Sequence, residues 1–122
     1  MASKNFYGPE VVYEVPYKKL YIGFIVDDET GEPWFLVKYI HRIIGKLGVA
    51  LNKRCGGFEN HSCIIRPNGA IEDLLSYEGL VRALYSCSRK SFPYCESRSR
   101  NLVKFIEESK DKFFAYMKGE DA

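Results

Sequence analysis

Residues 20–36 read LYIGFIVDDETGEPWFL, and this stretch decides the fold. Leu20–Val26 is dense in β-branched and aromatic residues, a composition typical of a β-strand. Residues 27–32 are polar, and Gly31 can adopt the positive φ that a turn requires. A second apolar run begins at Pro33 and continues to Leu36. The sequence therefore predicts a β-hairpin made of these two runs.

A helix is predicted directly after the hairpin, over about residues 37–47. Its apolar residues share one face at helical spacing, whereas three basic residues placed four apart share another. The apolar set is Val37, Ile40, Ile43, Ile44 and Leu47, and the basic set is Lys38, Arg42 and Lys46. Gly48 is expected to end the helix. An anionic partner could lie along the basic row, although such rows are more often merely solvated.

The next part of the chain is rich in turn signals. Residues 49–61 contain two adjacent glycines and predict a loop. Residues 63–66 (CIIR) predict a short strand, closed by a turn at residues 67–69 (PNG). The acidic pairs at 27–28 and 72–73 are both expected to lie in turns.

Two further helices are predicted in the second half of the chain. Ser76 is a natural N-cap for the first of them, which continues through Leu84 and Cys87. Residues 88–97 are expected to form a loop. The last helix is expected over about residues 98–117, and its buried side would carry Leu102, Phe105, Ile106, Phe113 and Met117.

The predicted class is α+β, with a small antiparallel sheet or β-hairpin packed with about three α-helices in a single domain. A chain of 122 residues suits one domain, and an aromatic content of 15% fills a core with few side chains. Residues 1–19 are expected to be an extended lead-in with a short strand near 11–15. The domain would cover residues 20–118, followed by a flexible tail at 119–122.

Little in the sequence indicates an enzyme, a cofactor or a metal site. The cysteines are Cys55, Cys63, Cys87 and Cys95, and no two have the close spacing of a structural zinc site. No motif activates a cysteine beside His41 or His61, and Cys87 is expected to be a packed core thiol. The sole tryptophan, Trp34, is expected in the core rather than as an anchor for a partner.

The N-terminal residues contain no apolar stretch of signal-peptide length. The apolar runs are also much shorter than the roughly 20 residues of a membrane span. An intracellular protein with reduced thiols and no membrane partner is therefore expected.

Charge is distributed unevenly although the formal net charge is only +2. Residues 38–104 contain 12 Lys and Arg against 5 Asp and Glu, whereas the two ends contain 6 basic and 11 acidic residues. A basic middle between acidic ends favours a local anionic partner, although such charges can also simply coat a solvated surface.

Two blocks of sequence resemble the Bro-N domain, a family of large DNA viruses of insects and of phages. The first is residues 30–40 (TGEPWFLVKYI) running into Leu47-Gly48, and the second is residues 74–84 (LLSYEGLVRAL) followed by Ser88-Arg89-Lys90. Their order and spacing match the family over roughly residues 20–108. The resemblance implies a viral DNA-binding domain that influences replication or transcription, in the host nucleus, the cytoplasm or both.

Charge layout and resemblance together predict binding to the nucleic-acid backbone, mainly without sequence specificity. The expected contacts are Lys38, Arg42, Lys46, Lys53, Arg54, Arg82, Arg89, Lys90, Arg98, Arg100 and Lys104. Helix N-termini at Ser76 and Ser97 offer backbone N–H groups, and Tyr85 and Tyr94 offer rings for stacking. The sequence does not distinguish DNA from RNA or single from double strands. It also leaves a homo-oligomer open.

The alternative is a protein-interaction module that holds a host or viral protein. Such a module would present an exposed apolar patch, or aromatic anchors, instead of a continuous basic face. A small enzyme is the least favoured hypothesis because it would need convergent titratable groups in a pocket.

Overall fold

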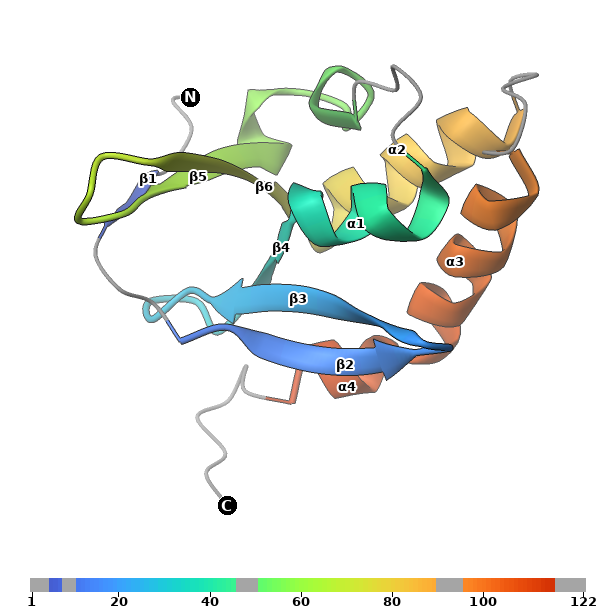
Figure 1. The fold of residues 1–122 in the computed structure, drawn as a ribbon, viewed down its shortest axis with the longest axis horizontal. Helices are drawn as coiled ribbons and strands as arrows, with labels where there is room; N and C mark the ends of the chain where they lie inside the picture. Colours follow the sequence, from blue (N-terminus) through green and yellow to red (C-terminus); the bar gives the residue numbers. More distant parts are fainter. Residues whose placement is uncertain (1–4, 8–10, 46–50, 90–95, 116–122) are drawn as a thin grey trace.

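The computed structural model describes residues 5–7, 11–45, 51–89 and 96–115. Within them lies a six-stranded sheet with the strand order β1-β5-β6-β4-β3-β2 (Figure 1). The strands are β1 (Asn5–Tyr7), β2 (Tyr13–Tyr17), β3 (Leu20–Val26), β4 (Pro33–Leu36), β5 (His61–Ile65) and β6 (Ile71–Ser76). β1 runs parallel to β5, and all other neighbours are antiparallel. The α+β class is confirmed, but the sheet is larger than the small sheet or hairpin that was predicted.

The hairpin of β3 and β4 forms as predicted. Phe24 pairs with Phe35, and Ile25 pairs with Trp34. In the connecting turn the N–H of Gly31 donates to the carbonyl oxygen of Asp27 at 2.7 Å, and Gly31 has φ 76°. The positive φ explains why glycine is placed there, since other residues adopt it at a cost.

The strands that were missed have weak sequence signals. β6 contains Glu72 and Asp73, so this acidic pair lies in a strand and not in the predicted turn. Glu72 is tolerated because Lys38 and Arg66 reach it from neighbouring elements. β2 lies close to the short strand predicted near residues 11–15, whereas β1 was missed; its pairing with β5 joins residues far apart in the sequence. Such non-local pairing leaves no pattern in a short stretch of sequence from which the strand could be predicted.

The helices are α1 (Val37–Ile44), α2 (Tyr77–Arg89), α3 (Glu96–Glu108) and α4 (Lys110–Phe113). α1 ends earlier than predicted because Gly45 adopts φ 94° and its N–H caps the carbonyl oxygen of His41. The predicted last helix is divided at Ser109, and its first part begins at Glu96 rather than Arg98. The predicted loop at 49–61 contains two short 3-10 turns, η1 (Leu51–Lys53) and η2 (Phe58–Asn60).

A large core lies between one face of the sheet and the helices. Phe113 from α4 is fully buried, with its ring 5.4 Å from that of Phe24 and 5.1 Å from that of Phe35. Cys87 is also fully buried, as predicted for a core thiol. After the break at Ser109, α4 runs in a different direction from α3 (Figure 1), and this brings Phe113 against the two central phenylalanines.

A second, smaller core lies on the other face of the sheet. It contains Trp34, which is 7% exposed, together with Phe6, Ile25, Leu36, Ile64 and Leu74. The core role predicted for Trp34 is confirmed. Because both faces of β4 are covered, its four residues are all buried and its sequence shows no alternation.

Tyr39 of α1 fixes that helix against β3. A Cβ atom added at Gly23 would lie 2.5 Å from the Tyr39 ring, so the ring occupies the space that a side chain would need. The Tyr39 hydroxyl donates to Glu14 Oε2 at 2.8 Å. Burial and this hydrogen bond both raise the pKa of Tyr39 above its usual value.

Candidate nucleic-acid interface

The basic row on α1 is partly neutralised by acidic and aromatic neighbours. Lys38 Nζ lies 3.3 Å from Glu72 Oε1, and the Arg42 guanidinium lies over the Tyr39 ring, 5.8 Å from its centroid. Burial alone would raise the pKa of Glu72, but hydrogen bonds from Arg66 and Lys38 and their charges hold it below its usual value. Lys46, the third member of the row, lies outside the described residues.

Two other predicted contacts are paired within their own helices. Arg82 Nη2 lies 2.8 Å from Glu78 Oε2, and Arg100 Nη2 lies 3.1 Å from Glu96 Oε2. Both pairs have the i, i+4 spacing that faces side chains toward each other on a helix. A phosphate that approached either arginine would have to compete with a carboxylate.

Three predicted residues are gathered at the C-terminal end of α2. Arg54 Nη1 donates to Ser86 Oγ at 3.1 Å, which places the end of η1 against the last turns of the helix. Arg89 lies three positions after Ser86, on the same side of α2. Lys53 and Arg89 are exposed, and within residues 51–89 and the other described ranges neither forms an ion pair. We call Lys53, Arg54 and Arg89 the basic end of α2.

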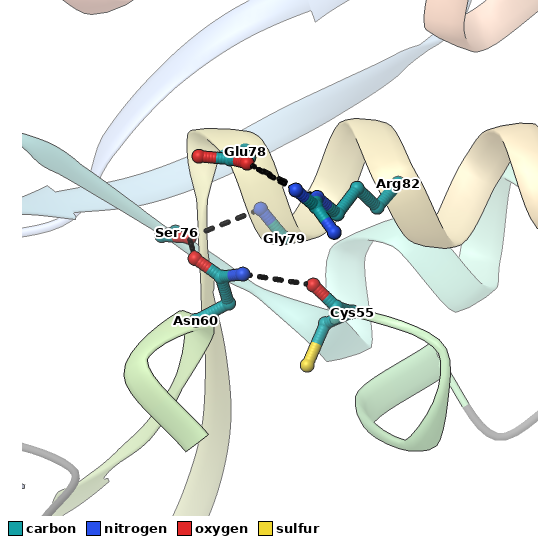
Figure 2. Close-up of polar contacts among 6 residues, drawn as sticks. All are labelled: Cys55, Asn60, Ser76, Glu78, Gly79 and Arg82. Atoms are coloured by element: carbon teal, nitrogen blue, oxygen red, sulfur yellow. Dashed lines mark hydrogen bonds and ion pairs between the residues drawn. The ribbon is translucent and has the colours of Figure 1, made fainter. Parts of the chain in front are cut away.

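A polar network holds the segment 55–60 against the other end of α2 (Figure 2). Asn60 Nδ2 donates to the carbonyl oxygen of Cys55 at 3.0 Å, and Ser76 Oγ donates to Asn60 Oδ1 at 2.8 Å. Ser76 Oγ also accepts the N–H of Gly79 at 3.0 Å, so the predicted N-cap is confirmed. The network fixes the position from which η1 reaches the helix.

Gly79 is required by this packing. A Cβ atom at position 79 would lie 2.7 Å from Asn60 Cβ and 2.9 Å from the Asn60 carbonyl oxygen. Glycine inside a helix normally lowers stability, so the close approach of residue 60 supplies the physical reason for it.

Arg98 and Lys104 of α3 line two hollows that do not include the residues of the basic end of α2. Arg98 is exposed and lines a hollow of about 150 Å³ with Lys18 and Ile43. Lys18, which was not among the predicted contacts, occupies the two-residue turn between β2 and β3 with φ 57°. Its only local signal is the Lys-Lys pair at positions 18–19, which falls outside the basic middle of the chain.

Lys104 lines a different hollow, together with Tyr85 and Arg100. The Tyr85 hydroxyl donates to Glu107 Oε1 at 2.6 Å, and this hydrogen bond is the main cause that raises the pKa of Tyr85. Tyr85 is 40% exposed, but its hydroxyl is thus engaged. Lys90 and Tyr94 lie outside the described residues.

Among the residues that the structure describes, no three His, Cys, Asp or Glu side chains are placed to hold a metal ion. Cys55 and Cys87 are buried, Cys63 is half-buried, and Cys95 is outside the described ranges. No helix in the described part of the chain has both the length and the apolarity to cross a membrane.

Comparison of the chain with protein-family models, with curated proteins and with solved structures gave no match. The resemblance to the Bro-N domain therefore remains a prediction from the sequence.

Proposed function

We propose that this protein binds the sugar-phosphate backbone of nucleic acid through the basic end of α2. The observation that supports the proposal is the contact of Arg54 with Ser86, 3.1 Å long. It brings Lys53 and Arg54 to the same helix end as Arg89, although they lie far apart in the sequence. Three clustered cations provide phosphate contacts, which give affinity without sequence specificity.

The expected contribution of each other predicted contact depends on whether a carboxylate is already paired with it. Lys38, Arg82 and Arg100 each face a carboxylate and contribute less. Arg98 and Lys104 form no ion pair within the described ranges, but each lines a hollow apart from the basic end of α2, so they are secondary contacts. The proposed footprint is therefore centred on the C-terminal end of α2 (Figure 1).

The contacts are made by side chains and not by helix N-termini. The C-terminal end of a helix carries partial negative charge, so backbone groups there do not attract phosphate. At the N-terminal end of α2, Ser76 Oγ already accepts the N–H of Gly79, and Glu78 adds negative charge. The cap and the carboxylate make the N-terminal end of α2 less favourable for phosphate than an uncapped helix start.

In agreement with the Bro-N resemblance, we propose that this binding influences replication or transcription in an infected cell. Both processes expose nucleic acid to a backbone-binding protein of modest affinity. Whether DNA or RNA is preferred is decided by experiment.

The test is fluorescence anisotropy with random-sequence single- and double-stranded DNA and RNA at several salt concentrations. The double variant Lys53→Gln/Arg89→Gln is compared with Lys19→Gln/Lys112→Gln, which removes two exposed cations elsewhere. The first variant should weaken binding about tenfold and reduce the slope of log K against log salt by about two. The control variant should change the affinity and the salt slope by much less. Equal losses in the two variants would show that only net charge matters.

A further inference from the structure

A pocket of about 430 Å³ lies at the opposite end of α2 from the basic residues. Its walls come from four segments: the turn before β4 with the start of that strand, η2, the end of β6 with the start of α2, and α4 with the residue after it. The residues that matter for its chemistry are Glu32, Glu59, Glu78, Tyr77, Phe114 and Lys110. We call this the acidic pocket.

The pocket has an excess of negative charge. Glu32 and Glu59 are exposed, and in the part of the chain described neither carboxylate forms an ion pair. Glu78 is already paired with Arg82 at 2.8 Å. Among the described residues that line the pocket, Lys110 is the one basic residue. Two carboxylates therefore face one ammonium group.

The aromatic side of the pocket already receives a cation. The rings of Tyr77 and Phe114 are 5.3 Å apart at an interplanar angle of 72°. Lys110 Nζ lies 5.2 Å from the centroid of Tyr77 and 5.5 Å from that of Phe114. An ammonium over two ring faces is attracted by their negative quadrupoles, and such contacts at exposed sites are weak enough to exchange.

The pocket wall is firmly placed. Phe113 is fully buried against Phe24 and Phe35, and this anchors α4 on the core. Lys110 and Phe114 flank that anchor and are separated by one helical turn, so both project on the same side. On the facing segment, Asn60 is held by Ser76 at 2.8 Å. The cation site is therefore formed before any partner arrives.

We propose that the acidic pocket takes a lysine or arginine side chain from a basic segment of a protein partner, in exchange with Lys110. The incoming cation would lie over Tyr77 and Phe114, and Glu32 and Glu59 would neutralise it. Phe58, which precedes Glu59 and is 75% exposed, offers apolar surface to the neighbouring residues of that segment. Phosphate is excluded as an occupant because two unpaired carboxylates repel it, so this site is separate from the proposed nucleic-acid footprint.

The test uses a short lysine-rich peptide and a counterpart in which glutamine replaces lysine. Binding is followed by calorimetry and by the fluorescence of Trp34, the sole tryptophan, which lines this pocket. The lysine peptide should bind and change the emission, and the glutamine peptide should do neither. Glu32→Gln/Glu59→Gln should weaken binding about fivefold, because two charge contacts are lost. Glu108→Gln, an exposed carboxylate outside the pocket, should leave binding unchanged.

The Lys110→Ala variant tests whether the incoming cation replaces Lys110 over the two rings or is only attracted to the acidic surface. Removing the resident ammonium should tighten peptide binding about threefold, whereas Phe114→Leu should weaken it because one ring is lost. Weaker binding by Lys110→Ala would overturn the exchange, and equal binding of both peptides would overturn the site.

A second copy of this chain is the rival occupant, since its own basic end carries Lys53, Arg54 and Arg89. Sedimentation of the full chain at increasing concentration tests this. Self-association that both Glu32→Gln/Glu59→Gln and Lys53→Gln/Arg89→Gln abolish would replace the peptide proposal. A monomer that still binds the lysine peptide would support it, whatever the outcome for nucleic acid.

Discussion

The two ends of α2 differ in charge, although one 13-residue helix connects them. The N-terminal end carries Glu78 and lies beside Glu32 and Glu59, whereas the C-terminal end carries Arg89 beside Lys53. Both arrangements suit the helix dipole, which is positive at its start and negative at its end. At a rise of about 1.5 Å per residue the two regions are separated by roughly 18 Å.

This comparison shows why the net charge of +2 conveys so little about function. A separation of roughly 18 Å exceeds the Debye length of about 8 Å at physiological salt, so the two regions act independently on exposed partners. The protein can therefore attract a phosphate chain at one end of α2 and a cationic side chain at the other. The following variants test whether the two ends are built and charged as described.

The largest expected effect is on the packing of the N-terminal end. Gly79→Ala places a Cβ atom 2.7 Å from Asn60 Cβ, and the segment that carries Asn60 must shift. We expect a loss of about 2–3 kcal/mol in the free energy of unfolding, measured by urea denaturation. In an unobstructed helix the same change would stabilise the protein by about 1 kcal/mol, so the sign alone is decisive.

Gly69→Ala is the control for that variant. Gly69 has φ +89°, and no heavy atom would lie within 4 Å of an added Cβ atom. Only backbone strain is introduced, at a cost of about 1 kcal/mol. A larger loss at position 69 than at position 79 would refute the packing argument.

The second effect concerns the cap of α2. Ser76→Ala removes the acceptor for the Gly79 N–H and the donor to Asn60 Oδ1 at the same time. We expect a loss of about 2 kcal/mol, at the upper end for a cap, because Oδ1 of the buried Asn60 loses its donor as well. Urea denaturation of Ser76→Thr, which keeps the hydroxyl, should recover most of that stability.

A smaller effect contrasts two arginines on the same helix. Arg82 is paired with Glu78, whereas Arg89 forms no ion pair within the described ranges. Arg89→Gln should weaken nucleic-acid binding about fivefold in anisotropy titrations, and Arg82→Gln by less than about twofold. Equal losses would mean that the carboxylate partner is irrelevant and that the ranking of contacts is wrong.

The smallest effect is a pH dependence at Glu72. Its pKa is lower in the folded protein, so the unfolded chain takes up the proton first as the pH falls. The stabilisation is complete above the unfolded pKa and is lost as the pH falls through the folded pKa. Glu72→Gln should therefore lower stability by less than about 1 kcal/mol at neutral pH. Urea midpoints of the two proteins should converge as the pH falls through the folded pKa, and a constant difference would contradict the assigned cause.

Local patterns predicted much of the fold. The hairpin at 20–36 has dense β-forming residues and a glycine turn, and Ser76 precedes a clear apolar period, so these elements were found from the sequence alone. β1 depends on parallel pairing with β5, and β6 depends on cations from other elements that neutralise Glu72. Those contacts are non-local, and no short window of sequence contains them.

The candidate sites were harder to predict for the same reason. Sequence spacing placed Lys38, Arg42 and Lys46 in one row, but it could not show that Lys38 faces Glu72 across the fold. It also placed Arg54 and Arg89 in separate loops, whereas the contact with Ser86 brings them to one helix end. The acidic pocket combines four segments, and the helix break at Ser109 that positions Lys110 leaves no glycine or proline signal.

The most direct test of the central claim compares the salt dependence of nucleic-acid binding in three proteins. These are the wild type, the basic-end variant Lys53→Gln/Arg89→Gln and the acidic-pocket variant Glu32→Gln/Glu59→Gln. We predict salt-sensitive binding by the wild type, a slope reduced by about two in the basic-end variant, and an unchanged slope in the acidic-pocket variant. Absence of binding at low salt, or equal slopes in all three proteins, would contradict the assignment of nucleic acid to the basic end of α2.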